Sequence, residues 1–465
     1  MADDQANGSQ KKPWIMNAFA MMAPGHLAPG LWRHPTQEPQ TLDHWVRLAK
    51  FLDESGFHGI FFADVLGIYD IYNGNGPALK SGAQIPIQDV ALSISALAYA
   101  TKNLCFGITA STTYENPYAL ARKFSTLDQL SNGRVGWNIV TSYLESAAKS
   151  YGHEELIEHD ERYRMAHEFM EVVYKLLEGS WEDGSVKADK KSGVYVDPDK
   201  IKKIDHAGKY YKCAGPNLVS PSPQRTPFLL QAGASKAGQD FAATHAEAMF
   251  LPGMVPEKTR DIVKSMKDLL VQKGRSAGSV KFIAGIFICV DETDEKAQAK
   301  FDDLMQYADL EGTASLFGGW TGTDLSKFSD DEDFSFTGPP AIQSMITAWT
   351  KTVPGTEGQK WTKKHVLQQL AISGAHPRAI GSPQTVADIM QKWIDEADVD
   401  GFNISYATTP GTFEDVVKFV WPELKRRGVL SKLASQSQSQ SMREVFLQDG
   451  GGPTVRSGHP ALQYR

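Results

Sequence analysis

The sequence predicts an α/β protein, a (β/α)8 TIM barrel that carries long insertions. Short, continuously apolar runs alternate with amphipathic segments along the chain, as strands buried on both faces of a parallel sheet alternate with their covering helices. There are eight such runs, which is the number of strands in a TIM barrel. A doubly wound sheet is the structural rival, but the GxGxxG sequence that usually follows its first strand is absent.

The expected strands are short and end in turn residues. They are Ile15–Ala20, Gly59–Ala63, Leu104–Ala110, Val135–Val140, Pro227–Gln231, Ala248–Leu251, Phe282–Val290 and Gly401–Ser405. Between them, Thr41 is expected to cap a helix that stops at Gly56, and Asp89 to cap another. Ser382 and Pro383 have the residue types of a helix start.

The chain has 465 residues. An ordinary barrel needs about 250 residues, so roughly 200 are expected to be insertions. Three segments qualify as insertions: Gly67–Gln88, Gly179–Arg225 and Glu311–Gly381. We expect them to cluster where a barrel binds its substrate. We also expect a disordered N-terminus over residues 1–12, a barrel domain over 13–430, and a low-complexity linker with a C-terminal arm over 431–465, where SQSQSQS occurs.

Composition limits the possible partners and compartments. The net charge of −7 and pI near 6.0 argue against a nucleic-acid or anionic-membrane surface. No apolar run approaches the roughly 20 residues of a membrane span, and the polar start does not read as a signal peptide. Three widely separated cysteines favour a reduced, cytoplasmic setting and give no metal-binding spacing. The sequence also lacks HxH after the first strand and GxSxG, so we expect neither a metal centre nor a serine hydrolase.

Polar residues follow several expected strands. His26 comes shortly after the first strand, and Asp64 directly after the second. Catalytic groups of barrels sit on such loops. A structural histidine and a turn-capping carboxylate remain the alternatives.

Asn138 is unusual because it lies within a strand that is otherwise apolar. A buried amide without hydrogen-bond partners costs about 1–3 kcal/mol, so either the protein or a ligand must satisfy it. Thr109 ends the preceding strand and lies at the same expected rim. Hydroxyls and amides at neighbouring strand ends can bind the edge of a flat heteroaromatic ring, or simply bind one another.

A second polar group begins with the segment HDERYRMAHEF. His159 and Tyr163 are four residues apart and share one face near a helix start. In QAGASKAG, small residues that include Ala234 and Ser235 surround a strand-to-helix turn, which lets a backbone approach a phosphate closely. Together the two segments predict the binding of a phosphorylated cofactor across the barrel mouth.

Five collinear segments resemble the bacterial-luciferase-like flavin monooxygenases. They are NAFAMMAPGHLAPGLWRHP, LDQLSNGRVGWNIVTS, HDERYRMAHEF, QAGASKAG and IGSPQTVADIM…DGFN. The subgroup resembled contains nitrilotriacetate monooxygenase component A, dibenzothiophene-sulfone monooxygenase and long-chain alkane monooxygenase. The resemblance runs from about residue 14 to 430.

This resemblance implies a luciferase-like TIM barrel that uses O2 and reduced FMN delivered by a separate flavin reductase, and a homodimer or homotetramer. It implies that His26 lies beside the reacting end of the flavin. The residues that it places against the flavin are Asp64, Thr109, Asn138, His159, Tyr163, Ala234 and Ser235. The expected substrate is a small organic compound such as a xenobiotic sulfone or an aminopolycarboxylate. Tyr143 stands where the alkane enzyme has a histidine, which makes an alkane less expected.

Two other classes remain possible from the sequence. One is a luciferase-fold protein that binds flavin without turnover. The other is an oxidoreductase that transfers hydride with a deazaflavin.

Overall fold

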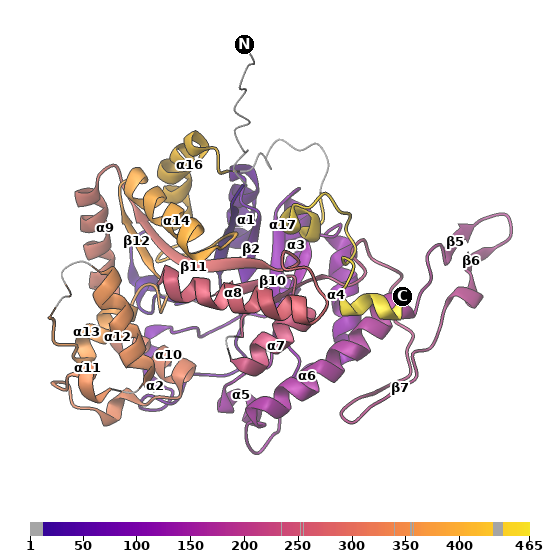
Figure 1. The fold of residues 1–465 in the computed structure, drawn as a ribbon, viewed down its shortest axis with the longest axis horizontal. Helices are drawn as coiled ribbons and strands as arrows, with labels where there is room; N and C mark the ends of the chain where they lie inside the picture. The colour runs from indigo at the N-terminus through magenta and orange to yellow at the C-terminus, as the bar shows by residue number, and fades with distance from the viewer. Residues whose placement is uncertain are drawn as a thin grey trace, which may run out of the picture.

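The structure is a computed structural model that describes residues 13–233, 235–251, 253, 255–338, 340–353, 356, 358–430 and 440–465. Within these ranges, eight parallel strands form a closed barrel, because β11 pairs with both β13 and β10 (Figure 1). In their order around the barrel they are β1 (Ile15–Ala20), β2 (Gly59–Phe62), β3 (Cys105–Ser111), β4 (Val135–Val140), β9 (Phe228–Gln231), β10 (Ala248–Leu251), β11 (Lys281–Val290) and β13 (Gly401–Ser405). The predicted barrel is confirmed.

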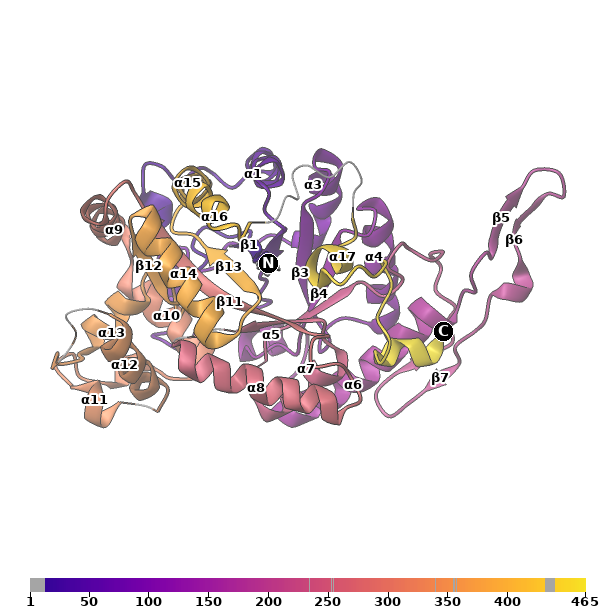
Figure 2. The same cartoon turned by 45° about the horizontal axis from the view of Figure 1, so that its top comes forward.

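Helices cover the outside of the barrel (Figure 2). They include α1 (Leu42–Ser55), α3 (Ile94–Ala100), α4 (Pro117–Leu130), α6 (His159–Tyr174), α7 (Lys236–His245), α8 (Pro256–Gln272), α9 (Asp294–Tyr307), α14 (Pro383–Ala397), α15 (Gly411–Asp415) and α16 (Trp421–Arg427). Helix α5 (Glu145–Ser150) instead packs against the Gly67–Gln88 segment at the mouth of the barrel. The predicted boundary residues act as expected: Thr41 accepts a hydrogen bond from the His44 N–H at 3.3 Å, and Gly56 ends α1 at φ 83°.

The turn between α4 and β4 has the geometry that its sequence predicts. Asn132 and Gly133 have φ values of 56° and 83°, the left-handed conformation that stops a helix. The Gly133 N–H donates to the Asp128 carbonyl at 2.8 Å, and β4 begins two residues later at Val135. This turn therefore fixes where Asn138 enters the sheet.

A ninth parallel strand, β12 (Arg378–Gly381), was not predicted. It pairs with the carboxyl half of β11 from Phe287 onward, while the preceding part of β11 pairs with β13 and β10. Strand β11 is ten residues long, and its neighbour changes from β10 in the first half to β12 in the second half. The four-residue run RAIG, which begins with an arginine, is too short and too polar to be recognised as a buried strand.

Two of the three predicted insertions lie at the carboxyl ends of the strands. Gly67–Gln88 contains α2 (Gly76–Ser81), and Glu311–Gly381 overlaps α10 (Leu310–Thr321) and contains α11 (Phe334–Thr337), α12 (Pro340–Thr352) and α13 (Lys363–Leu370). Helices α2 and α10 pack tightly, since a Cβ on Gly312 would lie 2.2 Å from the Ser81 hydroxyl. The helices of the second insertion have a small hydrophobic core of their own, which includes Phe317, Trp361 and Leu367.

The prediction that all insertions cluster at this mouth is wrong for most of Gly179–Arg225. This segment joins the end of the α6 region to the start of β9, so it leaves the barrel at the amino ends of the strands. Its hairpin β5 (Val186–Asp189) and β6 (Val194–Val196) projects away from the barrel (Figures 1 and 2). Only the part around β7 (His206–Ala207) and β8 (Lys212–Cys213) turns back along α6, where the Tyr211 hydroxyl donates to the Thr112 carbonyl at 3.3 Å.

The described part of the C-terminal arm covers the amino end of the barrel. It contains α17 (Met442–Leu447) and a short 3-10 helix over Pro460–Tyr464. Apolar side chains of α17 pack against the strands inside the barrel, including Phe228, Leu230 and Phe250. The arm thus contributes to the core of the barrel, although the sequence predicted only a tail that is not a domain.

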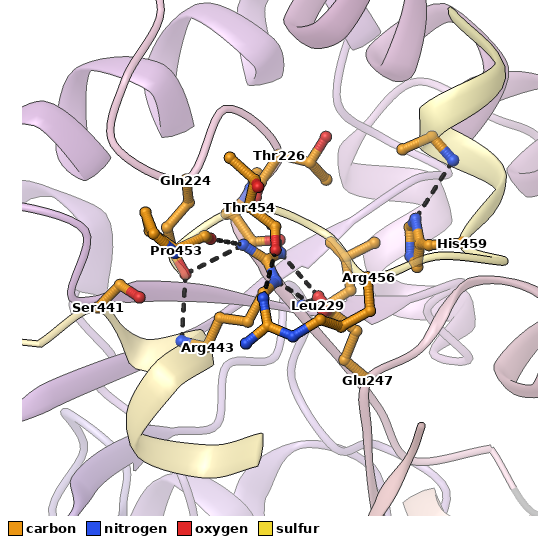
Figure 3. Close-up of polar contacts among 12 residues, drawn as sticks. Gln224, Thr226, Leu229, Glu247, Ser441, Arg443, Pro453, Thr454, Arg456 and His459 are labelled. Carbon is orange, nitrogen blue, oxygen red and sulfur yellow. Dashed lines mark hydrogen bonds and ion pairs between the residues drawn. The ribbon is translucent and has the colours of Figure 1, made fainter. Parts of the chain in front are cut away.

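One fully buried arginine anchors this arm (Figure 3). Arg443 donates to both carboxylate oxygens of Glu247, at 2.6 and 2.8 Å, and to the carbonyls of Thr226, Pro227 and Pro453. Its own backbone N–H donates to Gln224 at 3.3 Å. Burial alone would raise the pKa of Glu247, but the charge and hydrogen bonds of Arg443 outweigh this effect and lower it.

Candidate active site

Three of the predicted residues meet where the starts of α6 and α7 approach each other. His159 and Tyr163 lie on the first turns of α6, with ring centroids 5.2 Å apart. Ser235 caps α7 and accepts a hydrogen bond from the Gly238 N–H at 3.1 Å, and its hydroxyl lies 3.3 Å from His159 Nε2. We name His159, Tyr163 and Ser235 the anion cradle, because hydroxyls, an imidazole and a helix N-terminus are donors for a phosphate.

Glycines make room for this cradle. A Cβ on Gly233 or Gly238 would lie 2.7 or 2.8 Å from the Tyr163 hydroxyl oxygen, so a larger residue at either position would displace the tyrosine. Burial raises the pKa of Tyr163 above its usual value, which keeps the hydroxyl protonated as a donor. Ala234, the remaining predicted residue of this turn, lies outside the described residues.

Asn138 is only half satisfied by the protein. Its amide nitrogen donates to the Thr109 hydroxyl at 2.9 Å, and that hydroxyl donates to the Phe62 carbonyl at 2.9 Å. Because the Thr109 proton is used in this way, its oxygen must accept from Asn138, which fixes the orientation of the amide. The other amide atom, Oδ1, is buried and has no hydrogen-bond partner in the part of the chain that the structure describes. It is an acceptor available to an N–H group on the edge of a flat ring.

Asp64 and Thr109 line a cavity of about 570 Å³ at the mouth of the barrel. Burial, and secondly the Asp89 carboxylate, raise the pKa of Asp64 to about 7. Asp64 can therefore gain or lose a proton near neutral pH. The anion cradle and His26 do not line this cavity, so the predicted site residues form three neighbouring groups.

His26 is buried against aromatic rings. Its ring centroid lies 4.4 Å from that of Phe19 and 5.7 Å from that of Tyr406, and Gln84 donates to its backbone carbonyl at 2.6 Å. Burial, with a further contribution from His376, lowers the pKa of His26 to about 3. The imidazole is consequently neutral at physiological pH. A role for His26 must therefore use hydrogen bonding by the neutral ring.

Sequence reasoning missed a hydrogen-bonded group beside Gln84. The Tyr69 hydroxyl donates to Gln84 at 2.9 Å, lies 2.9 Å from the Tyr143 hydroxyl, and accepts from Trp320 at 3.3 Å. Tyr69 and Gln84 lie in one insertion, but Tyr143 follows β4 and Trp320 lies on α10. No local sequence pattern therefore joins the group. Gln84, which bonds both Tyr69 and the His26 carbonyl, was the only polar residue of the SGAQIPIQDV segment that could have suggested the group.

No group of three or more His, Cys, Asp or Glu side chains in the described ranges is arranged to hold a metal ion. None of the helices described is long and apolar enough to cross a membrane.

A closed parallel barrel with hydroxyl, imidazole and amide groups at the carboxyl ends of its strands has the architecture of a barrel enzyme. The chain belongs to the luciferase-like monooxygenase family, whose family model matches residues 19–400. It is a flavin-dependent monooxygenase, and the predicted family is thereby confirmed.

The similarity to individual proteins extends over most of the chain. The dimethyl-sulfide monooxygenase of Hyphomicrobium sulfonivorans is 42% identical, with 98% of this chain and 94% of that protein covered. The long-chain alkane monooxygenase of Geobacillus thermodenitrificans is 43% identical, with 89% and 90% covered. The crystal structure of DmoA from Hyphomicrobium sulfonivorans matches with a TM-score of 0.92 at 42% identity, covering 98% of this chain and 96% of that one.

Proposed function

We propose that the protein is the oxygenase component of a two-component system. It takes reduced FMN from a separate flavin reductase and uses O2 to oxygenate a small organic substrate. The observation that carries this proposal is the anion cradle of His159, Tyr163 and Ser235, which offers donors for the phosphate that distinguishes FMN from riboflavin. We further propose that Asn138 Oδ1 accepts from the flavin ring, and that Asp64 and Thr109 complete the ring-edge contacts.

Reduced flavin, when bound, activates O2 so that one oxygen atom passes to the substrate and the other leaves as water. The protein's residues bind the flavin, orient it and enclose the site. The cradle fixes the phosphate end, the pair Asn138 and Thr109 fixes the ring edge, and Phe19 and Tyr406 give His26 apolar surroundings that exclude water.

The substrate is proposed from the relatives. A dimethyl-sulfide monooxygenase and a long-chain alkane monooxygenase have nearly the same sequence identity to this chain. A dialkyl sulfide is therefore a candidate substrate in addition to the sulfones and aminopolycarboxylates. We also propose a cytoplasmic homodimer or homotetramer. The projecting hairpin β5–β6 supports assembly, because it exposes Val186, Val194 and Tyr195 away from the barrel.

The test is oxygen incorporation. The purified protein, a flavin reductase, NADH and FMN are supplied with ¹⁸O2 and, separately, dimethyl sulfide, dibenzothiophene sulfone, nitrilotriacetate and hexadecane. We expect one product that carries a single ¹⁸O atom. A protein that binds reduced FMN but neither accelerates its oxidation nor labels any product would be the non-catalytic class. Turnover that requires a reduced deazaflavin and ignores O2 would indicate hydride transfer.

The anion cradle makes a separate prediction. Charge-assisted hydrogen bonds contribute about 1.5–3 kcal/mol each, so Tyr163→Phe should weaken the binding of reduced FMN about tenfold or more. Equilibrium titration under anaerobic conditions measures this, with riboflavin as the ligand that lacks the phosphate and should lose little. Tyr99→Phe is the matched control, because Tyr99 is 95% exposed. Unchanged FMN affinity in both Tyr163→Phe and Ser235→Ala would show that the anion cradle does not bind the FMN phosphate.

A further inference from the structure

A second imidazole lies beside His26. His376 belongs to the segment between α13 and β12, far along the chain from the loop that carries His26. Its ring centroid is 5.7 Å from that of Phe19, and the Phe19 ring also packs against His26, with centroids 4.4 Å apart. The two histidines thus share one aromatic neighbour, and His376 is close enough to His26 to contribute to the lowering of its pKa.

The barrel provides space for His376 by omitting a side chain. Gly285 lies on the inward face of β11, two residues after Ile283 of the barrel interior. A Cβ at Gly285 would lie 2.5 Å from His376 Nε2 and 2.6 Å from its Cδ2, which no real side chain permits. The ring therefore occupies a position that any residue other than glycine at 285 would close.

Both imidazoles have an unused nitrogen. Nδ1 of His26 and Nδ1 of His376 are shielded from solvent and have no hydrogen-bond partner among the described residues. Burial lowers the pKa of His376 to about 4, so both rings are neutral at physiological pH. A buried polar group without a partner costs about 1–3 kcal/mol, and both of these nitrogens belong to rings that pack against Phe19.

We propose that His376 is a second catalytic residue, which together with His26 hydrogen-bonds a polar group of the substrate through the two Nδ1 atoms. This inference rests on the proposed monooxygenase function and names the chemistry of its substrate. The ring contacts of the pair are the side chains of Phe19 and Tyr406, which carry no charge. Two neutral imidazoles among such rings suit a small neutral molecule with one polar heteroatom, such as a sulfide or sulfone. They do not offset the charges of an aminopolycarboxylate.

The first experiment uses the protein without flavin. The ¹⁵N-histidine signals of His26 and His376 are assigned with His26→Asn and His376→Asn, and dimethyl sulfone is titrated in as an unreactive neutral probe. We expect both Nδ1 signals to shift together with one dissociation constant, and iminodiacetate to leave both unchanged. The proposal is overturned if neither signal responds to the sulfone, or if iminodiacetate moves both.

The second experiment compares His376→Leu with His376→Asn, whose amide can replace Nδ1, and with His365→Leu as a control on α13. For whichever compound the wild type oxygenates, the leucine variant should give about tenfold less product per reduced FMN oxidised, which is the loss of roughly one hydrogen bond. The balance should appear as H2O2. FMN affinity should be unchanged, and the apo-protein melting temperature should be equal or higher, because an unpartnered polar atom has been removed.

If the leucine variant does not fold, the asparagine variant still tests whether His376 hydrogen-bonds the substrate. It should recover at least half of the wild-type yield. Full product yield in His376→Leu, or no recovery in a folded His376→Asn, contradicts the proposal. Should the wild type oxygenate nothing, the function proposed above fails, and the flavin-free titration still tests the histidine pair.

Discussion

Replacing His26 with alanine should leave reduced FMN bound and oxidised, but should uncouple that oxidation from product formation. The anion cradle lies at the starts of α6 and α7, whereas His26 lies on the loop after β1, so FMN affinity should not change. In the role proposed for it, the neutral imidazole provides a fixed hydrogen bond at the reacting end of the site. Removing such a fixed donor typically costs about 10²–10³-fold. We therefore expect H2O2 to replace almost all of the product, measured as product and peroxide formed per reduced FMN.

The pH dependence separates this role from acid–base catalysis. A histidine whose pKa is lowered to about 3 stays neutral at any pH above that value. The product yield should thus show no transition between pH 6 and 8 that disappears in His26→Ala. A change in product yield near pH 6.5 that is absent in His26→Ala would contradict the role of a neutral imidazole. Equal product yield in wild type and His26→Ala would show that His26 is only structural.

Replacing Arg443 with methionine should cost about 3–5 kcal/mol of unfolding free energy. Breaking a buried ion pair from one side leaves the other charge buried without compensation. Here that charge is Glu247, which is 2% exposed. Urea unfolding followed by circular dichroism measures the loss.

Two controls make this prediction specific. Arg456→Ala on the same arm removes an ion pair with Asp449 that is partly exposed, and should cost about 0–1 kcal/mol. The double variant Arg443→Met, Glu247→Gln removes both charges and should recover most of the loss. The pKa of Glu247 is lowered in the folded protein, so the stabilisation exists above its usual value of 4.5 and is lost as the pH falls through the folded pKa. Equal effects of Arg443→Met and Arg456→Ala would show that the buried pair is not special.

The barrel was predictable because its strands are continuously apolar and its helices have recognisable ends. Ile15–Ala20, Val135–Val140, Ala248–Leu251 and Gly401–Ser405 are strands with the bounds that the sequence indicated. The anion cradle was predictable for a local reason, since a residue pair on one helix face and a small-residue turn each have a sequence pattern. The contact between them follows from the order of the strands.

The rest depends on contacts that no local pattern encodes. His376 comes to lie against Gly285 because β12, which follows it in the chain, pairs with β11. The direction of the Gly179–Arg225 insertion follows from which end of a strand it leaves. The pKa values of His26 and Asp64 result from burial, which a spacing rule cannot give. For Asn138, the sequence position predicted that the amide must be hydrogen-bonded. Only the structure shows that Thr109 accepts from the amide nitrogen, while the amide oxygen has no partner among the described residues.

The covering of the barrel's amino end by α17 has a consequence for biosynthesis. Every strand of the barrel precedes α17 in the chain, so a ribosome completes them before Met442 has been made. During that interval Phe228, Leu230 and Phe250 lack the side chains that shield them in the finished protein. A nascent chain in this state presents an apolar surface that chaperones can bind and that other nascent chains can adhere to. Nonsense mutations between residues 431 and 441 should accordingly produce aggregated or degraded polypeptide, although they leave all strands and the whole candidate active site encoded.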